Sequence, residues 1–353
     1  MKILICNPGS TSTKIGIFED EKPIFEKTLR HSMQELDGFE KIGDQYDLRM
    51  SVIMAAMNEA GVNPDELACV VGMGGLLKPI AGGTYGVNEA MAADLKSGIY
   101  GEHASNLGGL IAKAIGDKVG IPAFIVDPVV VDEMIDVSRF SGHPAIPRRS
   151  IFHALNQKAT ARKYCREFGK KYEEVNLVIV HMGGGISCAL HHKGRAIDAN
   201  NALDGDGPFT PERSGGLPSG QLAALCFSGK YSHSDIKLMI KGKGGMVGYF
   251  GTNSMMDIEE LAKTDPQAKL AMDAMALQIA KEIAAVSTSA CGQIDAILLT
   301  GGIAYSDYIT SEITRRTSFI ADVKRYPGED ELSALALGAL RVLRGEEEAK
   351  IYA

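Results

Sequence analysis

The sequence predicts an α/β fold built from two related domains. Short apolar runs that end in glycine alternate with longer helical patterns along the 353 residues, as in proteins whose helices cover the faces of a sheet. Two strand–turn–strand units, over residues 3–20 and 175–198, share one plan, and each opens one half of the chain. A repeated plan of this kind indicates a duplicated domain.

Helices and strands are expected at intervals along the rest of the chain. Ser150 and Asp265 are each expected to cap a helix, because their side-chain oxygens can accept a hydrogen bond from an unpaired backbone N–H. The helix after Pro266 is apolar on more than one side, which predicts that it is buried. The expected helices cover 51–60, 105–115, 150–168, 266–290 and 332–343, and the expected strands cover 68–71, 123–126 and 296–299.

Composition argues against several classes of function. The net charge is −7 and no basic stripe is present, which argues against a nucleic-acid partner. No apolar run approaches the length of a membrane span, and the first residues lack a signal-peptide pattern, so a cytoplasmic protein is expected. The six cysteines are scattered, with no C-x-x-C pair, and are expected to be free thiols.

The segment from Asn7 to Lys14 is the first candidate binding site. It reads NPGSTSTK and lies between two apolar runs, as a turn between two strands would. Ser10, Ser12 and Lys14 offer hydroxyl groups and a cation, and the turn also offers backbone N–H groups. The sequence therefore predicts a phosphate-binding hairpin here.

Two later strands also run into glycine-rich turns, at residues 181–187 and 300–303. One such turn alone usually means only a tight change of direction. Three of them, the first two opening the two halves of the chain, favour a nucleotide site. The chain has no Walker A sequence and no convincing dinucleotide fingerprint, so the site is expected to be of another kind.

Six segments spread in order over nearly the whole chain form one pattern. They are residues 7–14, 101–108, 126–134, 150–158, 181–187 and 201–215. As a set they resemble the acetate kinase family of carboxylate kinases, and within it the butyrate kinases. The resemblance implies the fold of the superfamily that also holds sugar kinases, Hsp70 and actin, with two duplicated ribonuclease-H-like domains and an interdomain cleft.

The resemblance also implies a reaction and a division of labour. Residues 1–148 plus 333–353 would form the acyl-substrate domain, and residues 149–332 the nucleotide-binding and dimerisation domain. The reaction would be reversible ATP-dependent phosphorylation of a short-chain carboxylate, butyrate or a branched analogue, giving an acyl phosphate and ADP with Mg²⁺. A homodimer is expected, with the helix over 266–290 either lining its interface or serving as an internal core helix.

A carboxylate that attacks ATP is already ionised at neutral pH, so the reaction needs no general base. The protein has to position the reactants and to stabilise charge on the transferring group. By resemblance, Asp127, His153 and Arg213 are the catalytic residues. The position of Asp127 at the end of a predicted strand supports it independently, because ligands of α/β sheets bind at strand ends.

Other site residues are implied by the same resemblance. Asn7 and Glu331 would help to hold Mg²⁺. His103 and Asn106 are helix-spaced, and either face the cleft or serve as helix caps. The residues expected at the nucleotide are Ser10, Ser12, Lys14, His181, Gly183, Gly184, Gly185, Gly301 and Gly302.

Two stretches depart from the family pattern. Met73 occupies a turn where the family carries an arginine, and methionine makes no bidentate contact to a carboxylate. Ser254 and Met256 replace an acid and an arginine near the nucleotide. Each lost charge-assisted contact would cost about 1.5–3 kcal/mol of binding.

These departures keep two alternatives open. One is a nucleotide-binding paralogue with weakened catalysis, unless Lys78, or Arg148 and Arg149, supply the missing cation. The other is a sugar kinase of the same superfamily, for which Asp204 or Asp206 would have to act as the base.

Overall fold

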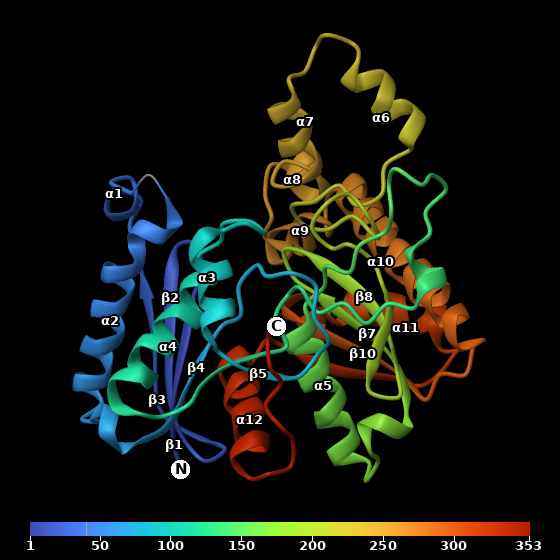
Figure 1. Cartoon of the computed structure of the whole chain (residues 1–353). Helices are drawn as coiled ribbons and strands as arrows, with labels where there is room; N and C mark the ends of the chain where they lie inside the picture. The colour runs from blue at the N-terminus through green and yellow to red at the C-terminus, as the bar shows by residue number, and fades with distance from the viewer. Residues whose placement is uncertain (40) are drawn as a thin grey trace. The chain divides into compact units, whose positions relative to one another are not determined.

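The computed structural model describes residues 1–39 and 41–353 (Figure 1). The chain forms two compact units. Unit 1 comprises Met1–Val131 and Asp330–Ala353, and unit 2 comprises Asp132–Glu329. Among the described residues, no helix combines the length and the apolar composition needed to cross a bilayer.

Unit 1 is built on a six-stranded sheet in the order β3-β2-β1-β4-β6-β5. The first three strands form an antiparallel meander, β4 and β6 continue the sheet in parallel with β1, and β5 is antiparallel to β6. The strands are β1 (Lys2–Pro8), β2 (Ser12–Glu19), β3 (Lys22–Arg30), β4 (Leu67–Gly72), β5 (Thr84–Gly86) and β6 (Ala123–Val126).

Unit 2 repeats this plan in a five-stranded sheet with the order β11-β10-β7-β8-β9. The strands β7, β8 and β9 form the antiparallel meander, and β10 and β11 run parallel to β7. The shared order confirms the duplication that the sequence predicts. The strands are β7 (Asn176–Met182), β8 (Ile186–His192), β9 (Arg195–Ala199), β10 (Ala296–Gly301) and β11 (Val323–Pro327).

Helices pack on both sheets (Figure 1). Those of unit 1 are α1 (Met33–Leu36), α2 (Tyr46–Glu59), α3 (Glu89–Ser97), α4 (Asn106–Val119) and α12 (Glu331–Leu343). Those of unit 2 are α5 (Ala154–Glu167), α6 (Ser219–Cys226), α7 (His233–Ile240), α8 (Gly245–Phe250), α9 (Met255–Leu261), α10 (Pro266–Ser287) and α11 (Asp307–Thr317). Short 3-10 turns are η1 (Ile42–Gln45), η2 (Pro64–Glu66), η3 (Asp136–Arg139), η4 (Tyr172–Glu174), η5 (Thr288–Ala290) and η6 (Gly302–Tyr305).

The two predicted helix caps have different outcomes. Asp265 caps α10 as expected, because its carboxylate accepts a hydrogen bond from Gln267 N at 2.8 Å. The expectation for Ser150 is wrong, because α5 begins at Ala154 with His153 in the capping position. The preceding residues are extended, and Ile151 O accepts a hydrogen bond from Ala202 N at 2.9 Å.

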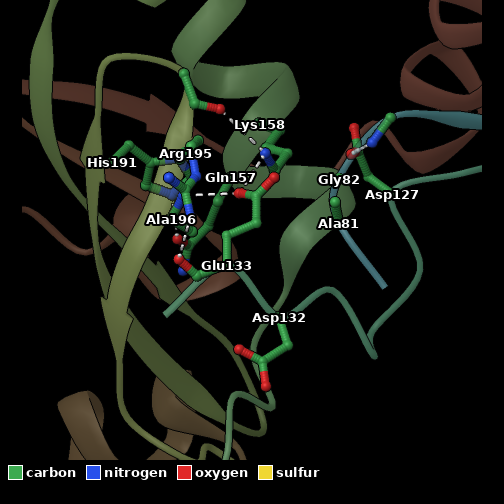
Figure 2. Close-up of polar contacts among 12 residues, drawn as sticks. Ala81, Gly82, Asp127, Asp132, Glu133, Gln157, Lys158, His191, Arg195 and Ala196 are labelled. Atoms are coloured by element: carbon green, nitrogen blue, oxygen red, sulfur yellow. Dashed lines mark hydrogen bonds and ion pairs between the residues drawn. The ribbon is translucent and has the colours of Figure 1, made fainter. Parts of the chain in front are cut away.

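The boundary between the units falls at Val131/Asp132 and not at residue 148. The segment after residue 131 is tied to β9, since Ile135 N donates to Ile197 O at 3.0 Å. Glu133 also accepts hydrogen bonds from Lys158 Nζ at 2.9 Å and from Ala196 N at 2.8 Å, and both charged side chains are buried (Figure 2). Such a buried pair is costly to break once formed, so it holds this segment in unit 2.

Helix α10 is a core helix of unit 2. Its buried residues include Met272, Met275, Ile279 and Ile283, which join the cluster formed by β7, β8 and β10. The predicted burial is confirmed for this side of the helix, whereas Leu270 and Leu277 on the other side are exposed. The helix also carries a titratable group with an unusual setting, Glu282.

Burial raises the pKa of the Glu282 carboxyl from 4.5 to about 7, together with repulsion from Asp206 and Asp198 that outweighs attraction by Arg148. The folded-state pKa lies above the unfolded-state value. The carboxylate therefore lowers stability above pH 7, and this cost vanishes as the pH falls below the unfolded-state pKa. This difference in pKa corresponds to a cost on the order of 3 kcal/mol at alkaline pH.

We predict that Glu282→Gln raises the free energy of unfolding by about 3 kcal/mol at pH 8 and by less than about 1 kcal/mol at pH 5. Urea unfolding of both proteins at the two pH values measures this difference. The exposed Glu348→Gln is the matched control and should change stability by less than about 0.5 kcal/mol. An equal gain in stability at both pH values would contradict the raised pKa of Glu282.

Candidate active site

The turn between β7 and β8 forms the centre of the candidate site in unit 2. Gly183 N donates to Gly185 O at 3.0 Å, which closes the turn. A Cβ at Gly185 would lie 2.1 Å from Nη1 of Arg213. The glycine therefore leaves the space that this guanidinium occupies, so the structure brings Arg213 and the predicted glycines together.

A second turn, Thr210–Arg213, carries the arginine. Thr210 N donates to Arg213 O at 2.9 Å, and Arg213 N donates to Thr210 Oγ1 at 3.0 Å. The same hydroxyl donates to Gly184 O at 2.6 Å, which fastens the two turns to each other. Arg213 Nη1 donates to Ala202 O at 2.6 Å. Burial lowers the pKa of this guanidinium, against the opposing effect of Glu212, but an arginine stays charged at neutral pH.

Two predicted histidines, His153 and His181, stack beside this turn. Their ring centroids lie 3.7 Å apart at an interplanar angle of 14°. The register explains the arrangement, since His181 lies directly opposite Ser187 in the β7–β8 pair and His153 Nδ1 lies 2.8 Å from Ser187 Oγ. Cross-strand partners share one face of a sheet, so a ring bound to Ser187 is placed over His181.

The electrostatic setting keeps His153 neutral. Burial holds its pKa well below the ordinary value of 6.5, and electrostatic interactions with His181 and Arg213 act in the same direction. His181 Nδ1 lies 2.9 Å from Asn156 Oδ1, and its Nε2 lies 3.0 Å from Glu329 Oε1. His153 is thus a neutral hydrogen-bonding group near the Arg213 guanidinium.

Gly301 is the last residue of β10 in unit 2, and Gly302 follows it. Gly301 has φ +86°, and a Cβ there would lie 2.4 Å from Met182 O. The close approach of β10 to the end of β7 therefore requires glycine at 301 for reasons of backbone packing. Gly302 is exposed and begins η6. Their predicted proximity to adenosine stays a prediction.

The residues predicted for unit 1 gather at the N-terminus of α12. Asn7 Nδ2 and Lys14 Nζ lie 2.8 and 2.9 Å from the same carboxylate oxygen, Glu331 Oε2. Asn7 and Lys14 are opposite each other in the β1–β2 pair, which sets both side chains on one face. The oxygens of Asn7 and Glu331 suit Mg²⁺, which commonly takes one or two protein oxygens and completes its shell with water and phosphate. The described residues contain no group of three His, Cys, Asp or Glu side chains that could hold a metal without such help.

The loop that carries Ser10 and Ser12 rests on a buried arginine. Arg49 is fully buried on α2 and donates to Ser12 O at 2.6 Å, to Thr13 Oγ1 at 2.9 Å and to Ser10 O at 3.3 Å. Gln45 Oε1 accepts a further bond from the same guanidinium at 3.0 Å. The carbonyl oxygens of the loop are thereby tied inward, away from any bound anion.

Asp127 follows β6 in unit 1 and is buried. Its Oδ1 accepts a hydrogen bond from Gly83 N at 2.6 Å, and its own N–H donates to Gly83 O at 3.0 Å. Its φ of +38° lies in the left-handed region, which is uncommon for a residue with a side chain. Figure 2 shows this carboxylate beside the backbone of Ala81 and Gly82.

Several candidate residues have partners that account for them locally. Asn106 Oδ1 accepts from Leu76 N at 2.8 Å, and its Nδ2 donates to Gly101 O at 2.9 Å, so Asn106 braces two turns of unit 1. His103 Nδ1 contacts Ser105 Oγ at 2.8 Å.

Three of the residues considered as replacement cations or acids, Lys78, Arg148 and Asp206, are engaged as well. Lys78 donates to Ala353 O, and Arg148 Nη1 donates to Asp198 Oδ1 at 2.9 Å. Ser254 caps α9 by accepting from Asp257 N at 3.2 Å, and Met256 is exposed. In a separate turn, Asp206 accepts from the backbone N–H groups of residues 201 and 207 at 3.0 and 2.9 Å.

Comparison with known proteins agrees with this arrangement. The model of the Acetokinase family matches residues 143–319. The chain is 56% identical to butyrate kinase 1 and 54% identical to butyrate kinase 2 of Clostridium acetobutylicum, each over 99% of both chains. The acetate kinase of Porphyromonas gingivalis has the same fold, with a TM-score of 0.78 and 19% identity over 97% of this chain and 99% of that one.

The chain therefore belongs to the acetate kinase family of carboxylate kinases. The predicted membership is confirmed, and so is the predicted fold of two duplicated α/β domains. Within the family, its similarity over the full length places it among the butyrate kinases.

The sequence alone did not single out Arg49, Thr210, Ser187 or Glu329. An arginine on the same side of α2 as Ile53 and Met57 is one available signal, because a buried charge requires partners. Thr210 and Ser187 lay inside segments that were recognised, yet their hydroxyl contacts depend on how distant turns meet. Glu329 belongs to the acidic run at residues 329–331, whose members look alike in the sequence. The structure separates them, because Glu331 belongs to unit 1 and Glu329 to unit 2.

We predict that Gly185→Ala displaces the Arg213 guanidinium and leaves the fold intact. The new methyl group meets only the flexible end of a side chain, so the free energy of unfolding should change by less than about 1 kcal/mol. A crystal structure of the variant should show the Arg213–Ala202 hydrogen bond broken. Gly142→Ala, whose Cβ meets nothing within 4 Å, is the control. An unmoved guanidinium would contradict the tight fit inferred at this turn.

Proposed function

We propose that this chain transfers the γ-phosphoryl group of ATP reversibly to a short-chain carboxylate, butyrate or a branched analogue, giving an acyl phosphate and ADP. The observation that carries the proposal is the 56% identity over 99% of both chains to a protein named butyrate kinase 1. The cluster of Arg213, His153 and the glycine turn at 183–185 supplies donors and charge suited to a phosphoryl group.

Each group has a part in this reaction. The carboxylate substrate is ionised at neutral pH and attacks without a base. The Arg213 guanidinium and the neutral His153 ring stabilise the charge that spreads over the oxygens of the transferring group. The backbone of Gly183–Gly185 holds phosphate oxygens of the nucleotide. In unit 1, Lys14 and the Ser10–Ser12 loop are further proposed nucleotide-binding groups.

Asn7 and Glu331 would hold Mg²⁺, directly or through water. When bound to the phosphates, this ion neutralises part of their charge. Lys14 shares Glu331 Oε2 with Asn7, and it keeps that carboxylate oriented toward the β1–β2 turn. Asp127, held in a fixed orientation by Gly83, completes the proposed set of catalytic residues.

The functional test is an assay of the purified protein with Mg²⁺-ATP and a panel of C2 to C6 carboxylates, in which hydroxylamine traps the acyl phosphate. We expect most product with C4 acids, and no product with sugars. Arg213→Met should lower kcat roughly 10²–10³-fold, whereas Arg315→Met, on the exposed side of α11, should leave it unchanged.

Other outcomes would change the proposal. ATP binding without acyl phosphate would favour the weakened paralogue that Met73 and Met256 suggest. Turnover with a hydroxyl substrate would favour a sugar kinase, although both carboxylate oxygens of Asp206 already accept hydrogen bonds from its own turn.

The proposed enzyme acts in the cytoplasm as a homodimer formed through unit 2. Leu270 and Leu277 lie two turns apart on α10 and are 60% and 42% exposed, and Phe227, after α6, is 91% exposed. A contiguous patch of exposed apolar side chains is typical of a contact surface, and Leu270 and Leu277 share one side of α10. Sedimentation at micromolar concentration should give a dimer of the 37.7 kDa chain. A monomer at that concentration would contradict this part of the proposal.

A further inference from the structure

A chain of buried hydrogen bonds runs from Tyr172 to His153 inside unit 2. Its intermediate members are His191, Gln157 and Ser187, all fully buried. The contacts are Tyr172 OH to His191 Nδ1 at 2.6 Å, His191 Nε2 to Gln157 Oε1 at 2.9 Å, Gln157 Nε2 to Ser187 Oγ at 2.9 Å, and Ser187 Oγ to His153 Nδ1 at 2.8 Å.

The direction of this chain follows from one carbonyl group. Gln157 Nε2 also lies 3.0 Å from Ser187 O. A carbonyl oxygen only accepts, so the amide nitrogen of Gln157 must face it, and the amide oxygen must face His191 (Figure 2). His191 therefore carries its proton on Nε2. Its Nδ1 is free to accept from Tyr172, because burial, Lys158 and Arg162 hold the pKa of His191 well below its ordinary value.

The hydrogen-bond partners of Ser187 likewise fix the direction in which its hydroxyl hydrogen points. Its Oγ accepts from Gln157 Nε2 and from the backbone N–H of His153, at 2.9 and 3.3 Å. A serine hydroxyl has two lone pairs and one hydrogen. With both lone pairs engaged, the hydrogen must point to the remaining neighbour, His153 Nδ1.

We propose that Ser187, oriented by Gln157, His191 and Tyr172, holds His153 as the neutral tautomer with its proton on Nε2. This makes Nε2–H a preset hydrogen-bond donor on the side of the ring away from Ser187. Resting on the function proposed above, that donor is directed at the transferring phosphoryl group. Ser187 and Gln157 are positioning residues that act through His153.

The stack with His181 completes the arrangement. Ring stacking at 3.7 Å fixes the plane of His153, and the hydrogen bond from Ser187 fixes which edge of the ring faces inward. A preset donor costs no reorganisation at the moment of reaction. An imidazolium would need an acceptor at Nδ1, and Ser187 Oγ has none left to offer.

The test reads the tautomer directly. Long-range ¹H–¹⁵N spectra of histidine-labelled protein at pH 7 distinguish a protonated from an unprotonated ring nitrogen, and His153→Gln assigns the signals among the eight histidines. We expect His153 to carry one proton, on Nε2, in the native chain. A proton on Nδ1, or on both nitrogens, would overturn the proposal whatever the activity.

Two substitutions then separate positioning from packing. Ser187→Ala removes the hydroxyl and should populate the Nδ1–H tautomer, with a roughly 10- to 100-fold loss of kcat and a change in KM for ATP within about twofold. Ser187→Thr keeps the hydroxyl and should restore both the spectrum and most of the activity. Ser287→Ala, at a buried serine that donates to Ile283 O within α10, is the control and should change neither.

The two proposals fail in different ways. If Ser187→Ala keeps the Nε2–H tautomer, the chain of buried hydrogen bonds does not set the tautomer of His153. This inference is then overturned even where kcat falls. If the spectra change as expected but the native protein forms no acyl phosphate, the tautomer assignment stands and the proposed function fails. If Ser187→Ala does not fold, the native spectrum and Ser187→Thr still decide the matter.

Discussion

The register of the β7–β8 hairpin is the constraint on which the candidate site of unit 2 depends. Both strands are buried along almost their whole length, so polar side chains on them must find partners within the protein. Because His181 is paired with Ser187, both lie on one face next to the N-terminus of α5. A slip of one residue would turn Ser187 to the other face. It would also remove the partner of His153 and move the turn that receives Arg213.

The duplicated hairpin of unit 1 uses the same geometry with different chemistry. There Asn7 faces Lys14 across β1 and β2, and both side chains reach one carboxylate oxygen of Glu331. In unit 1 the cation shares one acid with an amide, whereas the guanidinium of Arg213 lies near neutral His153 and 3.8 Å from Glu212. Arg49 supports the first loop from below by binding its carbonyl oxygens. Those dipoles would otherwise repel an anion near the loop of unit 1.

The sequence predicted the strands and the glycine turns because their signals are local. The sequence alone reveals the apolar run that ends at His181 and the glycines that follow it. The boundary at residue 131 was missed because it depends on Glu133, whose buried partner Lys158 lies 25 residues away. The sequence leaves Asn106 between two roles, and its bonds to Leu76 and Gly101, which brace two turns, depend on how separate segments meet.

A carboxylate kinase and a sugar kinase differ in whether the acceptor must lose a proton. A neutral histidine with its lone pair taken by a serine hydroxyl is a poor base, since Nδ1 is already an acceptor and Nε2 already carries its hydrogen. Such a ring still donates a full hydrogen bond to developing negative charge, at any pH where it stays neutral. Low basicity at this ring is harmless when the acceptor arrives ionised, whereas a hydroxyl acceptor would need a base elsewhere in the site. The buried serine, the stacked ring and the nearby arginine therefore suit an acceptor that brings its own charge.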